Sequence, residues 1–319
     1  MKTRKFLIAL VAILALFAAA CGDDDDSVAS SGGDDGGSES DAPDAPEGPT
    51  IKIGAQDFGE SAILAEIYGQ VLEANGYDVE QVSVGGFRDV LLGAFDGGDV
   101  NFSAEYAASM LEFLNDFAGE ATGDAAETVG LLQTQLDEIG LVATEPAPAV
   151  DTNAFVITQE TADAQGWEKI SDLPTDGADV KLGAPQDCET NPFCLVGLQE
   201  VYGIDLSGGF TPLESGLVAD ALADGGEINI GVLFSTSGRI ADEGWVLLED
   251  DMGMLAADNI TPVLSDEVAD AYGDDLTSLL NEISAAIDTD TLTELNKRFD
   301  IDKEDAADVA ADFISEAGL

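Results

Sequence analysis

Short apolar runs alternate with amphipathic segments along most of the chain. The first run, 51–55, precedes apolar positions spaced by three or four residues that end at Asn75-Gly76, and this spacing predicts a strand and then a helix. The next pair, 79–84 and 88–95, repeats the pattern. Two consecutive βα units predict a parallel sheet with right-handed crossovers. Later strands are predicted at 141–144, 154–158, 181–184, 227–234, 245–249 and 260–264, and later helices at 110–117, 128–139, 161–165, 193–202, 217–222, 275–287, 291–299 and 305–317.

Two prolines at 145–151 interrupt this series, and a new βα series starts at 154. After 250 the chain adds one more strand and three helices, which suit a return to the first sheet. The pattern therefore predicts an α/β protein of two lobes, with residues 50–152 plus 250–319 in lobe one and 153–249 in lobe two. Two crossovers between such lobes form a hinge, and a ligand is expected in the cleft between them.

The stretch from Val100 to Ser109 is predicted to be a buried strand that ends at a turn of small residues. Glu105 and Tyr106 then stand where ligands of open α/β sheets bind, at the carboxyl end of a strand. The alternative is a tyrosine at the edge of the core, with its hydroxyl on a neighbouring carbonyl group.

The N-terminus has the pattern of a secretory signal peptide over residues 1–20. Three basic residues precede 15 apolar ones, fewer than the roughly 20 that span a membrane. Ala18-Ala19-Ala20 leads directly into Cys21, which is typical of a bacterial lipoprotein in which the cysteine carries a diacylglyceryl group. Acyl chains at Cys21 would hold the mature protein at a membrane surface. A secreted protein without lipid is the alternative.

Residues 21–49 are predicted to be a lipidated cysteine followed by an acidic tether. Apart from Cys21 this segment consists almost entirely of Asp, Ser, Gly, Ala, Glu and Pro. Such a composition offers too little apolar surface to offset the entropy of ordering, so disorder is expected.

Charge and the absence of histidine exclude several function classes. The mature chain keeps eight Lys and Arg against 65 Asp and Glu, a formal charge of −57. Nucleic-acid binding is excluded because phosphates would be repelled. So acidic a surface is consistent with a saline environment outside the cell, where salt screens the self-repulsion, and it favours a monomer because like charges oppose self-association. Without histidine or a cysteine cluster, no metal site or Ser-His or Cys-His catalysis is predicted. No cofactor is expected.

Cys188 and Cys194 remain once Cys21 carries lipid. Two cysteines left over in an exported protein usually pair, so a disulfide is predicted, with two free thiols as the alternative. The loop that it closes is short, and its main effect would be on the shape of that loop.

Several motifs follow one another between Ile51 and the C-terminus. They are IGAQDFGES (53–61), LAEIY (64–68), GG (85–86), NFSAEY (101–106), PAPAVDTNAF (146–155), the Cys188 to Cys194 loop, LFSTS (233–237), VLLEDD (246–251) and ADNITP (257–262). Their order resembles that of one family, the glycine betaine/choline/proline-betaine substrate-binding proteins of osmoprotectant ABC importers. The resemblance covers the chain from Ile51 to the C-terminus. It implies a fold of the periplasmic-binding-protein type 2 superfamily, no enzymatic activity, and delivery of a small quaternary-ammonium solute to a membrane permease.

The resemblance also implies an aromatic cage around the ammonium group. A trimethylammonium lacks ordinary hydrogen-bond donors, so aromatic faces would hold it at roughly 0.5 to 2 kcal/mol per contact. Tyr106 is the cage tyrosine of the Glu-Tyr motif, and Phe155 and Phe234 stand at matching positions. Phe58 and Phe193 are further aromatic candidates in loops that face the cleft.

Polar ligand contacts depart from the family pattern. Gln56 stands where many relatives have Lys, Ser109 where many have Thr, and Asn191 near an Arg of some relatives. Without those cations the charge-assisted bonds to a betaine carboxylate are missing, which leaves choline or another alcohol-bearing ammonium open. Arg88 and Arg239 could compensate, or each could pair with a protein carboxylate. The predicted site is completed by two residues within the family motifs, Asn153 and Thr236.

Two other functions compete with this interpretation. The same fold could be a receptor for an amino acid, a polyamine or another small solute. Glu105 with Asp57 could instead act as an acid/base pair of a glycosidase, although carboxylate pairs arise by chance in so acidic a chain.

Overall fold

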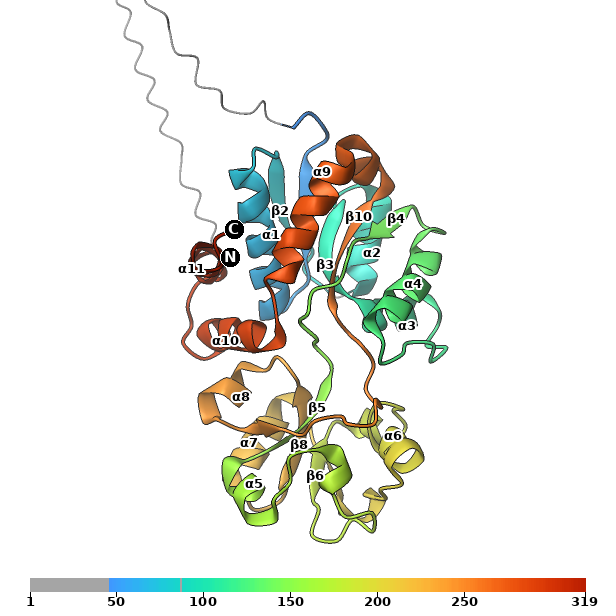
Figure 1. Ribbon diagram of the computed structural model, residues 1–319, viewed down its shortest axis with the longest axis vertical. Coiled ribbons are helices and arrows are strands. Elements are labelled where there is room, and N and C mark those ends of the chain that lie inside the picture. Colours follow the sequence, from blue (N-terminus) through green and yellow to red (C-terminus); the bar gives the residue numbers. More distant parts are fainter. Residues whose placement is uncertain (1–45, 87) are drawn as a thin grey trace, which may run out of the picture. The chain divides into compact units, whose positions relative to one another are not determined.

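The computed structural model describes residues 46–86 and 88–319, which fold around two mixed β-sheets (Figure 1). The signal peptide, Cys21 and the tether up to residue 45 were predictions that lie outside the described residues. No helix in the described part is both long and apolar enough to cross a bilayer.

The first sheet has the order β2-β1-β3-β10-β4, and the second has the order β7-β6-β8-β5-β9. The strands are β1 (Ile51–Ala55), β2 (Val79–Ser83), β3 (Phe102–Tyr106), β4 (Leu141–Ala143), β5 (Asn153–Ile157), β6 (Leu182–Ala184), β7 (Phe210–Pro212), β8 (Ile230–Phe234), β9 (Val246–Leu247) and β10 (Ile260–Ser265). The helices are α1 (Gly59–Ala74), α2 (Arg88–Gly97), α3 (Ala107–Leu114), α4 (Ala125–Leu136), α5 (Gln159–Gln165), α6 (Leu195–Gly197), α7 (Ser215–Asp224), α8 (Gly238–Glu243), α9 (Asp266–Ala285), α10 (Thr289–Asp300) and α11 (Ala306–Ala317).

The expected parallel βα units are present, since β1 pairs in parallel with both β2 and β3. The last strand differs, because β10 runs antiparallel to β3 and β4. This direction follows from its origin: β10 enters from the second sheet rather than through a crossover helix. In the second sheet β5 likewise runs antiparallel to β8.

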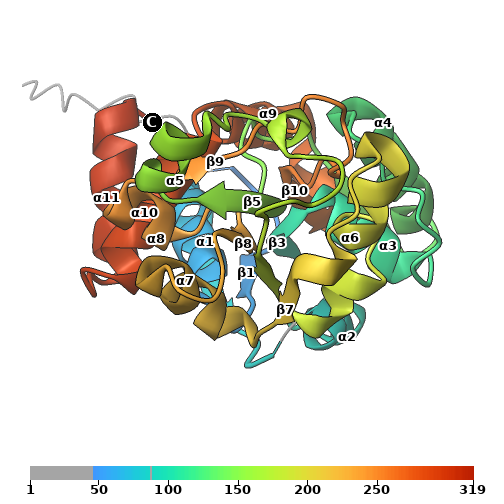
Figure 2. The same cartoon turned by 90° about the horizontal axis from the view of Figure 1, so that it is seen from below.

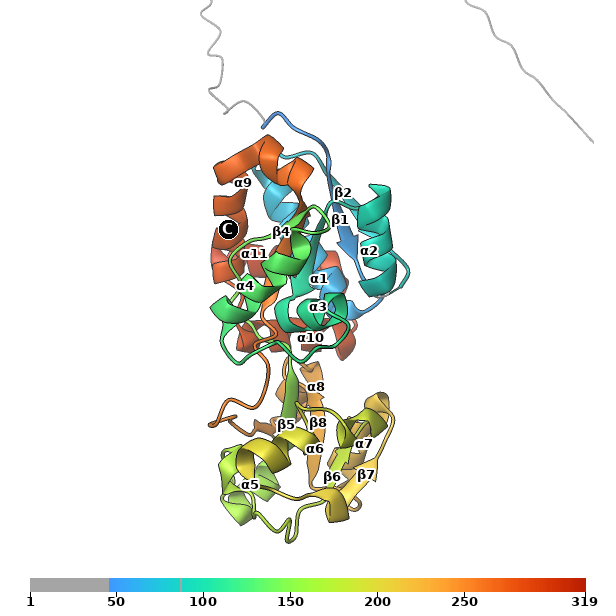
Figure 3. The ribbon, with the colours of Figure 1, turned by 90° about the vertical axis from the view of Figure 1, so that its right-hand side faces the viewer.

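The cores lie between each sheet and its helices. In the first sheet the largest cluster joins β1, β3 and β10 to α1 and α9, which lie side by side in Figure 1. A separate cluster packs α3 and α4 against Leu141 of β4 and Val263 of β10. Figure 3 shows α2 on the side of the first sheet opposite α9. In the second sheet α6 and α7 lie on opposite sides of β8, and each contributes to its own cluster (Figure 2).

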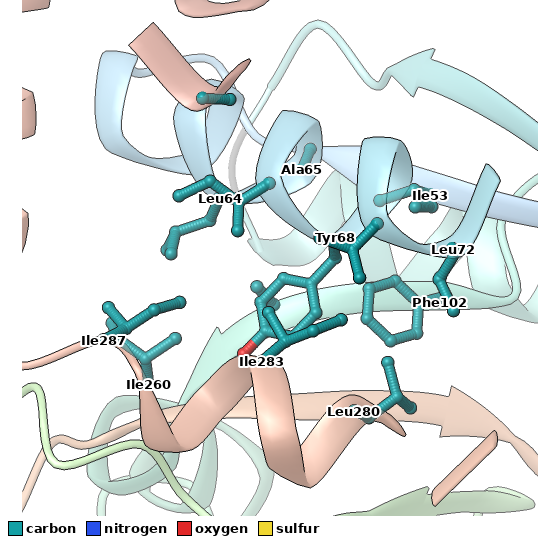
Figure 4. Close-up of a cluster of buried hydrophobic side chains, with 14 of the residues drawn as sticks. Ile53, Leu64, Ala65, Tyr68, Leu72, Phe102, Ile260, Leu280, Ile283 and Ile287 are labelled. Carbon is teal, nitrogen blue, oxygen red and sulfur yellow. The ribbon is translucent and has the colours of Figure 1, made fainter. Parts of the chain in front are cut away.

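Tyr68 is at the centre of the first core. Its ring lies among Leu72, Phe102, Leu280 and Ile283 (Figure 4), and its centroid is 5.5 Å from that of Phe102. Its hydroxyl shares a hydrogen bond of 2.9 Å with Ser284 Oγ. The only polar atom of a fully buried tyrosine ring is thus satisfied, as burial requires.

Two crossovers connect the sheets and run antiparallel beside each other. The chain leaves the first sheet after β4 and returns before β10. Val150 pairs with Asn259 across the crossovers, and the Asp151 amide donates a hydrogen bond of 3.0 Å to the Asp258 carbonyl. This pairing brings two carboxylates, Asp151 and Asp258, to the same place.

Candidate functional site

Two adjoining cavities lie where the crossovers meet the ends of β3 and β8. The first cavity, of about 540 Å³, and the second, of about 660 Å³, share five lining residues: Arg88, Ser109, Asp151, Phe234 and Asp258. Gln56, Phe58, Glu60, Tyr106, Thr236, Asn296 and Asp300 line the first cavity only, and Glu112, Phe113, Phe117, Asn153, Asn191 and Phe193 are among the residues that line the second only. All the residues predicted for the ligand site except Phe155 therefore line one or both cavities.

Tyr106 lies at the very end of β3 and forms the N-cap of α3. The expected turn of small residues is absent, because the strand passes directly into the helix at Ala107. The Tyr106 hydroxyl donates a hydrogen bond of 2.7 Å to Glu60 Oε1, and its ring centroid is 6.0 Å from that of Phe58. Burial, followed by the charge of Glu60, raises the pKa of Tyr106 well above its ordinary value, so the phenol stays neutral. The two rings therefore give this cavity an aromatic wall.

Glu105 holds Arg88 at the boundary between the cavities. Arg88 Nε and Nη2 donate to Glu105 Oε2 at 3.0 and 2.7 Å, and Gln56 Nε2 donates to Glu105 Oε1 at 2.9 Å. The Glu105 side chain is fully buried. Arg88 thus forms the ion pair that was one of its two predicted roles, while it also lines both cavities. Glu105 is fully engaged in this contact, which leaves it unsuited to acid/base work with Asp57.

Ser109 and Asp258 form a second fixed contact. The Ser109 amide donates to Asp258 Oδ1 at 2.9 Å, and the Ser109 hydroxyl donates to Asp258 Oδ2. Burial raises the pKa of Asp258 to about 6, against the lowering effect of these two hydrogen bonds. Asp258 therefore changes its charge in a pH range close to neutrality.

A polar network joins the end of β8 to α1 and α10. Thr236 Oγ1 donates to Asp151 Oδ1 at 2.8 Å, while Asn296 Nδ2 donates to Glu60 Oε2 at 2.5 Å and to the Thr236 carbonyl at 2.9 Å. Burial is the largest cause that raises the pKa of both Glu60 and Asp151, and their mutual repulsion raises that of Asp151 further.

Sequence reasoning did not assign Glu60, Asp151, Asp258 or Asn296 to the site. Three of them lay inside motifs that had been noticed: Glu60 in 53–61, Asp151 in 146–155 and Asp258 in 257–262. The carboxylates could have been found by asking which motif residues a cationic solute would need. Asn296 lies outside every motif, and only its tertiary contacts reveal it.

The second cavity is lined by the loop that contains the disulfide. Cys188 and Cys194 are bonded, with their Cα atoms 5.2 Å apart, which confirms the predicted pairing. Asn191 and Phe193 lie in this loop, where Asn191 Oδ1 accepts the Phe193 amide at 2.8 Å. Asn153 Nδ2 donates weakly to the Phe193 carbonyl at 3.4 Å.

Phe155 differs from its predicted role, because it is fully buried in the core of the second sheet. It pairs across β5 and β8 with Val232, whereas Asn153 pairs with Phe234 at the end of the sheet. Phe234, 60% exposed, is the aromatic residue that this strand pair presents to the cavities. Arg239 pairs with Asp220 and Glu243 and lies 5.7 Å from the Trp245 ring, which confirms the ion-pair alternative for this residue.

A family described as the substrate binding domain of ABC-type glycine betaine transport system matches residues 49–316. The chain belongs to this family. It is a substrate-binding protein of an ABC transporter, and the family confirms that it is not an enzyme. Proteins of this family act outside the cytoplasm, where they bind a small solute and pass it to a membrane permease.

Named relatives agree with the family. The chain is 29% identical over 281 residues to a glycine-betaine-binding protein of Pseudomonas aeruginosa, which covers 85% of this chain and 88% of that protein. It is 26% identical to the glycine betaine-binding protein YehZ of Escherichia coli, with 84% and 90% covered. Among solved structures, apo YehZ matches with a TM-score of 0.74 at 25% identity, covering 84% of this chain and 99% of that one. A glycine betaine/carnitine/choline ABC transporter protein matches with a TM-score of 0.75 at 24% identity, covering 84% and 98%. The predicted fold of the periplasmic-binding-protein type is thereby confirmed.

Proposed function

We propose that the protein binds a quaternary-ammonium compatible solute in the first cavity, with Phe58, Tyr106 and Phe234 as the aromatic faces. The observation that carries this proposal is the combination of these rings with the carboxylates of Glu60, Asp151 and Asp258. Aromatic faces and nearby negative charge both attract an ammonium that cannot donate hydrogen bonds. Gln56, Ser109 and Thr236 supply the polar part of the same wall.

Asn153, Asn191 and Phe193 belong to the second cavity, and we propose that they contact the solute when the lobes close. Residues 50–152 plus 250–319 act as lobe one and residues 153–249 as lobe two. The paired crossovers at Val150 and Asn259 suit a hinge between them. In this proposal closure shields the solute until the permease receives it.

We further propose that the mature chain begins at Cys21 and is held at the cell membrane by acyl groups on that thiol. The acidic tether then allows the folded part to extend away from the membrane surface. The protein acts as a monomer. Metabolic labelling with a fatty acid analogue tests the anchor: wild type incorporates the label and Cys21→Ser does not. Equal labelling of the two proteins would overturn it.

Calorimetric titration of the purified protein tests the ligand class. The affinities for glycine betaine, choline and carnitine should be compared with those for the amino acid proline and for a polyamine under the same conditions. Binding of at least one ammonium compound is expected, with no binding of proline. The cavity carboxylates would also suit a polyamine, so tight binding of spermidine without binding of any quaternary ammonium would favour the alternative receptor.

A further inference from the structure

The connection between α3 and α4 presents an exposed aromatic residue at the second cavity. Phe117, in this connection, is 75% exposed, the highest value among the large apolar residues that the structure describes. It lines the second cavity together with Pro192 and Phe193 of the disulfide loop, residues 188–194. Figures 1 and 3 place the connection at the end of the first sheet and its helices that faces α6. A single exposed apolar side chain is common, so its exposure alone carries no inference.

The backbone conformation of Phe117 is the unusual feature. Its φ of 59° lies in the left-handed region, as does the φ of 59° at the preceding residue, Asp116. Aspartate tolerates this region because its short side chain can form local hydrogen bonds, whereas a bulky aromatic residue rarely adopts it. Residues held there are strained and persist only where the surrounding structure imposes the conformation. Such residues concentrate at ligand clamps and switch regions.

Contacts on both sides of Phe117 impose this conformation. The Phe117 amide donates a hydrogen bond of 2.6 Å to the Glu112 carbonyl. The Glu112 carboxylate, in a residue that is 8% exposed, accepts the amides of Gly119 and Ala121, each at 2.6 Å. Phe117 therefore lies between fixed points of the backbone, and the position of its ring is part of the folded structure.

The connection belongs to lobe one in the proposed arrangement. The Thr122 carbonyl accepts a hydrogen bond of 2.7 Å from the Ala257 amide, which lies in the crossover that returns to the first sheet. The Phe113 ring packs beside Phe117, with centroids 6.5 Å apart and planes at 75°. Lobe two contributes the disulfide loop to the same cavity. Each lobe therefore brings apolar side chains to the space that closure would remove.

We propose that Phe117 is a closure residue. When the lobes close over the solute, its ring leaves water and packs against Pro192 and Phe193, which stabilises the closed form. The inference rests on the proposed function, since it assumes closure over a solute in the first cavity. Phe117 acts on the population of the closed form and not on the solute itself, so it raises the affinity for every bound solute by the same factor. The left-handed backbone holds the ring in place for this contact at the expense of stability.

Phe117→Gly and Asp116→Gly form a matched pair of variants of the full chain. Each replaces a residue at a φ of 59° with glycine, which adopts this conformation without strain. Each should therefore raise the thermal unfolding midpoint of the ligand-free protein, by roughly 1 to 3 °C. A ring that only supports the fold would lower this midpoint when it is removed, so a fall in Phe117→Gly would overturn the inference.

Calorimetric titration with choline, glycine betaine and carnitine distinguishes the two variants. Phe117→Gly is expected to bind each compound that wild type binds about 10-fold more weakly, since closure no longer buries the ring. Asp116→Gly should keep the wild-type affinity, because Asp116 is exposed and is not a lining residue of either cavity. Equal affinity of Phe117→Gly and wild type would contradict the inference. So would a loss for only one of several bound compounds, which would make Phe117 a contact of that compound.

Phe117→Trp measures closure directly. The emission of an exposed indole at this position should shift to shorter wavelength when closure over a solute buries it. Wild type provides the blank, because its own Trp167 and Trp245 are only 6% and 9% exposed. The absence of a shift with a solute that calorimetry shows to bind would refute the inference alone. If none of the three compounds binds wild type, the proposed function itself fails, and the inference fails with it.

Discussion

Tyr106 combines two roles that sequence reasoning had treated as alternatives. It is a buried tyrosine at the edge of the core, with its hydroxyl on Glu60, and it also lines the first cavity beside Phe58. Its acceptor is a carboxylate from α1 rather than a backbone carbonyl. The ring can therefore contact a ligand while its polar atom remains satisfied.

Replacing this ring tests its contact with the solute. Tyr106→Ala should weaken ammonium binding by roughly 1 to 3 kcal/mol, because it removes both ring burial and a cation–π contact. Tyr106→Phe keeps the ring and loses only the hydrogen bond to Glu60, so it should retain most of the affinity. Calorimetry on the two variants gives the comparison, and unchanged affinity in Tyr106→Ala would make this residue a packing residue only.

Asp258 should make stability depend on pH. Because burial raises its pKa from the ordinary 3.8 to about 6, the folded state binds a proton that the unfolded state releases between these values. The free energy of unfolding of the ligand-free protein should therefore fall as pH rises from about 4 to about 6, by up to about 3 kcal/mol from this group.

Asp258→Asn should remove that contribution, since the amide keeps the Ser109 contact without a charge. Urea unfolding across the same pH range gives the free energy of unfolding of both proteins, and parallel pH dependences would contradict the assignment.

The affinity of wild type for a cationic ligand should change in the opposite direction and rise with pH, because the ionised Asp258 attracts the ligand. The neighbouring charges of Arg88 and Glu105 act on the Asp258 pKa in opposite directions.

At the scale of elements, the close approach of α8 to α10 links the second sheet to the helices of the first. Gly238, at the start of α8, leaves no space for a side chain: an added Cβ would lie 2.5 Å from the Lys297 backbone nitrogen and 2.6 Å from its Cα. Thr293 and Asn296 of α10 donate to the carbonyls of Ser235 and Thr236 at the same junction. The glycine is what allows these two backbones to meet.

Gly238→Ala should lower the free energy of unfolding by roughly 1 to 3 kcal/mol, because backbone atoms cannot move aside as a flexible side chain could. Gly93→Ala is the matched control, since Gly93 lies in α2 with nothing within 4 Å of an added Cβ. That variant should gain roughly 0.5 to 1 kcal/mol from helix propensity. Chemical denaturation of both variants provides the measurement, and a neutral Gly238→Ala would show that the two helices can separate freely.

The elements themselves were largely predictable. Each strand expected in the first sheet is present, as are the helices that cover it. These elements could be predicted because the spacing of apolar residues along a helix or strand indicates which positions face the core. Two short elements of the second sheet, β7 and α8, were missed. Three-residue strands and six-residue helices carry too few positions to show a period.

At the scale of the whole molecule, the negative net charge is expected to limit the stability of the folded state. The full chain carries a formal charge of −54, and most of its carboxylates lack a basic partner because only 11 Lys and Arg are available. Self-repulsion of this size destabilises the compact state and is reduced by salt.

Thermal unfolding should therefore shift upward by several degrees between about 0.05 M and about 1 M NaCl. Binding of an ammonium solute should weaken over the same range, because salt screens its attraction to the cavity carboxylates. Differential scanning fluorimetry and calorimetric titration at each salt concentration give the two trends. A melting temperature that does not respond to salt would contradict the view that repulsion limits stability.

The sequence by itself determined the α/β alternation, the return of the chain to its first sheet, the disulfide and the resemblance that the family match confirms. These features depend on local periodicity, on composition and on the order of motifs along the chain, all of which can be read without knowing which residues meet. The lobe boundaries and the lipid anchor stay predictions.

Only the tertiary structure decided which side chains line the cavities. β5 is buried along almost its whole length, so its apolar run shows no alternation, and nothing in the sequence distinguishes the core position of Phe155 from a position facing the cavity. Asp151 and Asp258 are more than 100 positions apart, and they meet because two crossovers pair at Val150 and Asn259. The chain has many carboxylates, and only the pairing of segments that are distant in the sequence decides which few of them line the cavities.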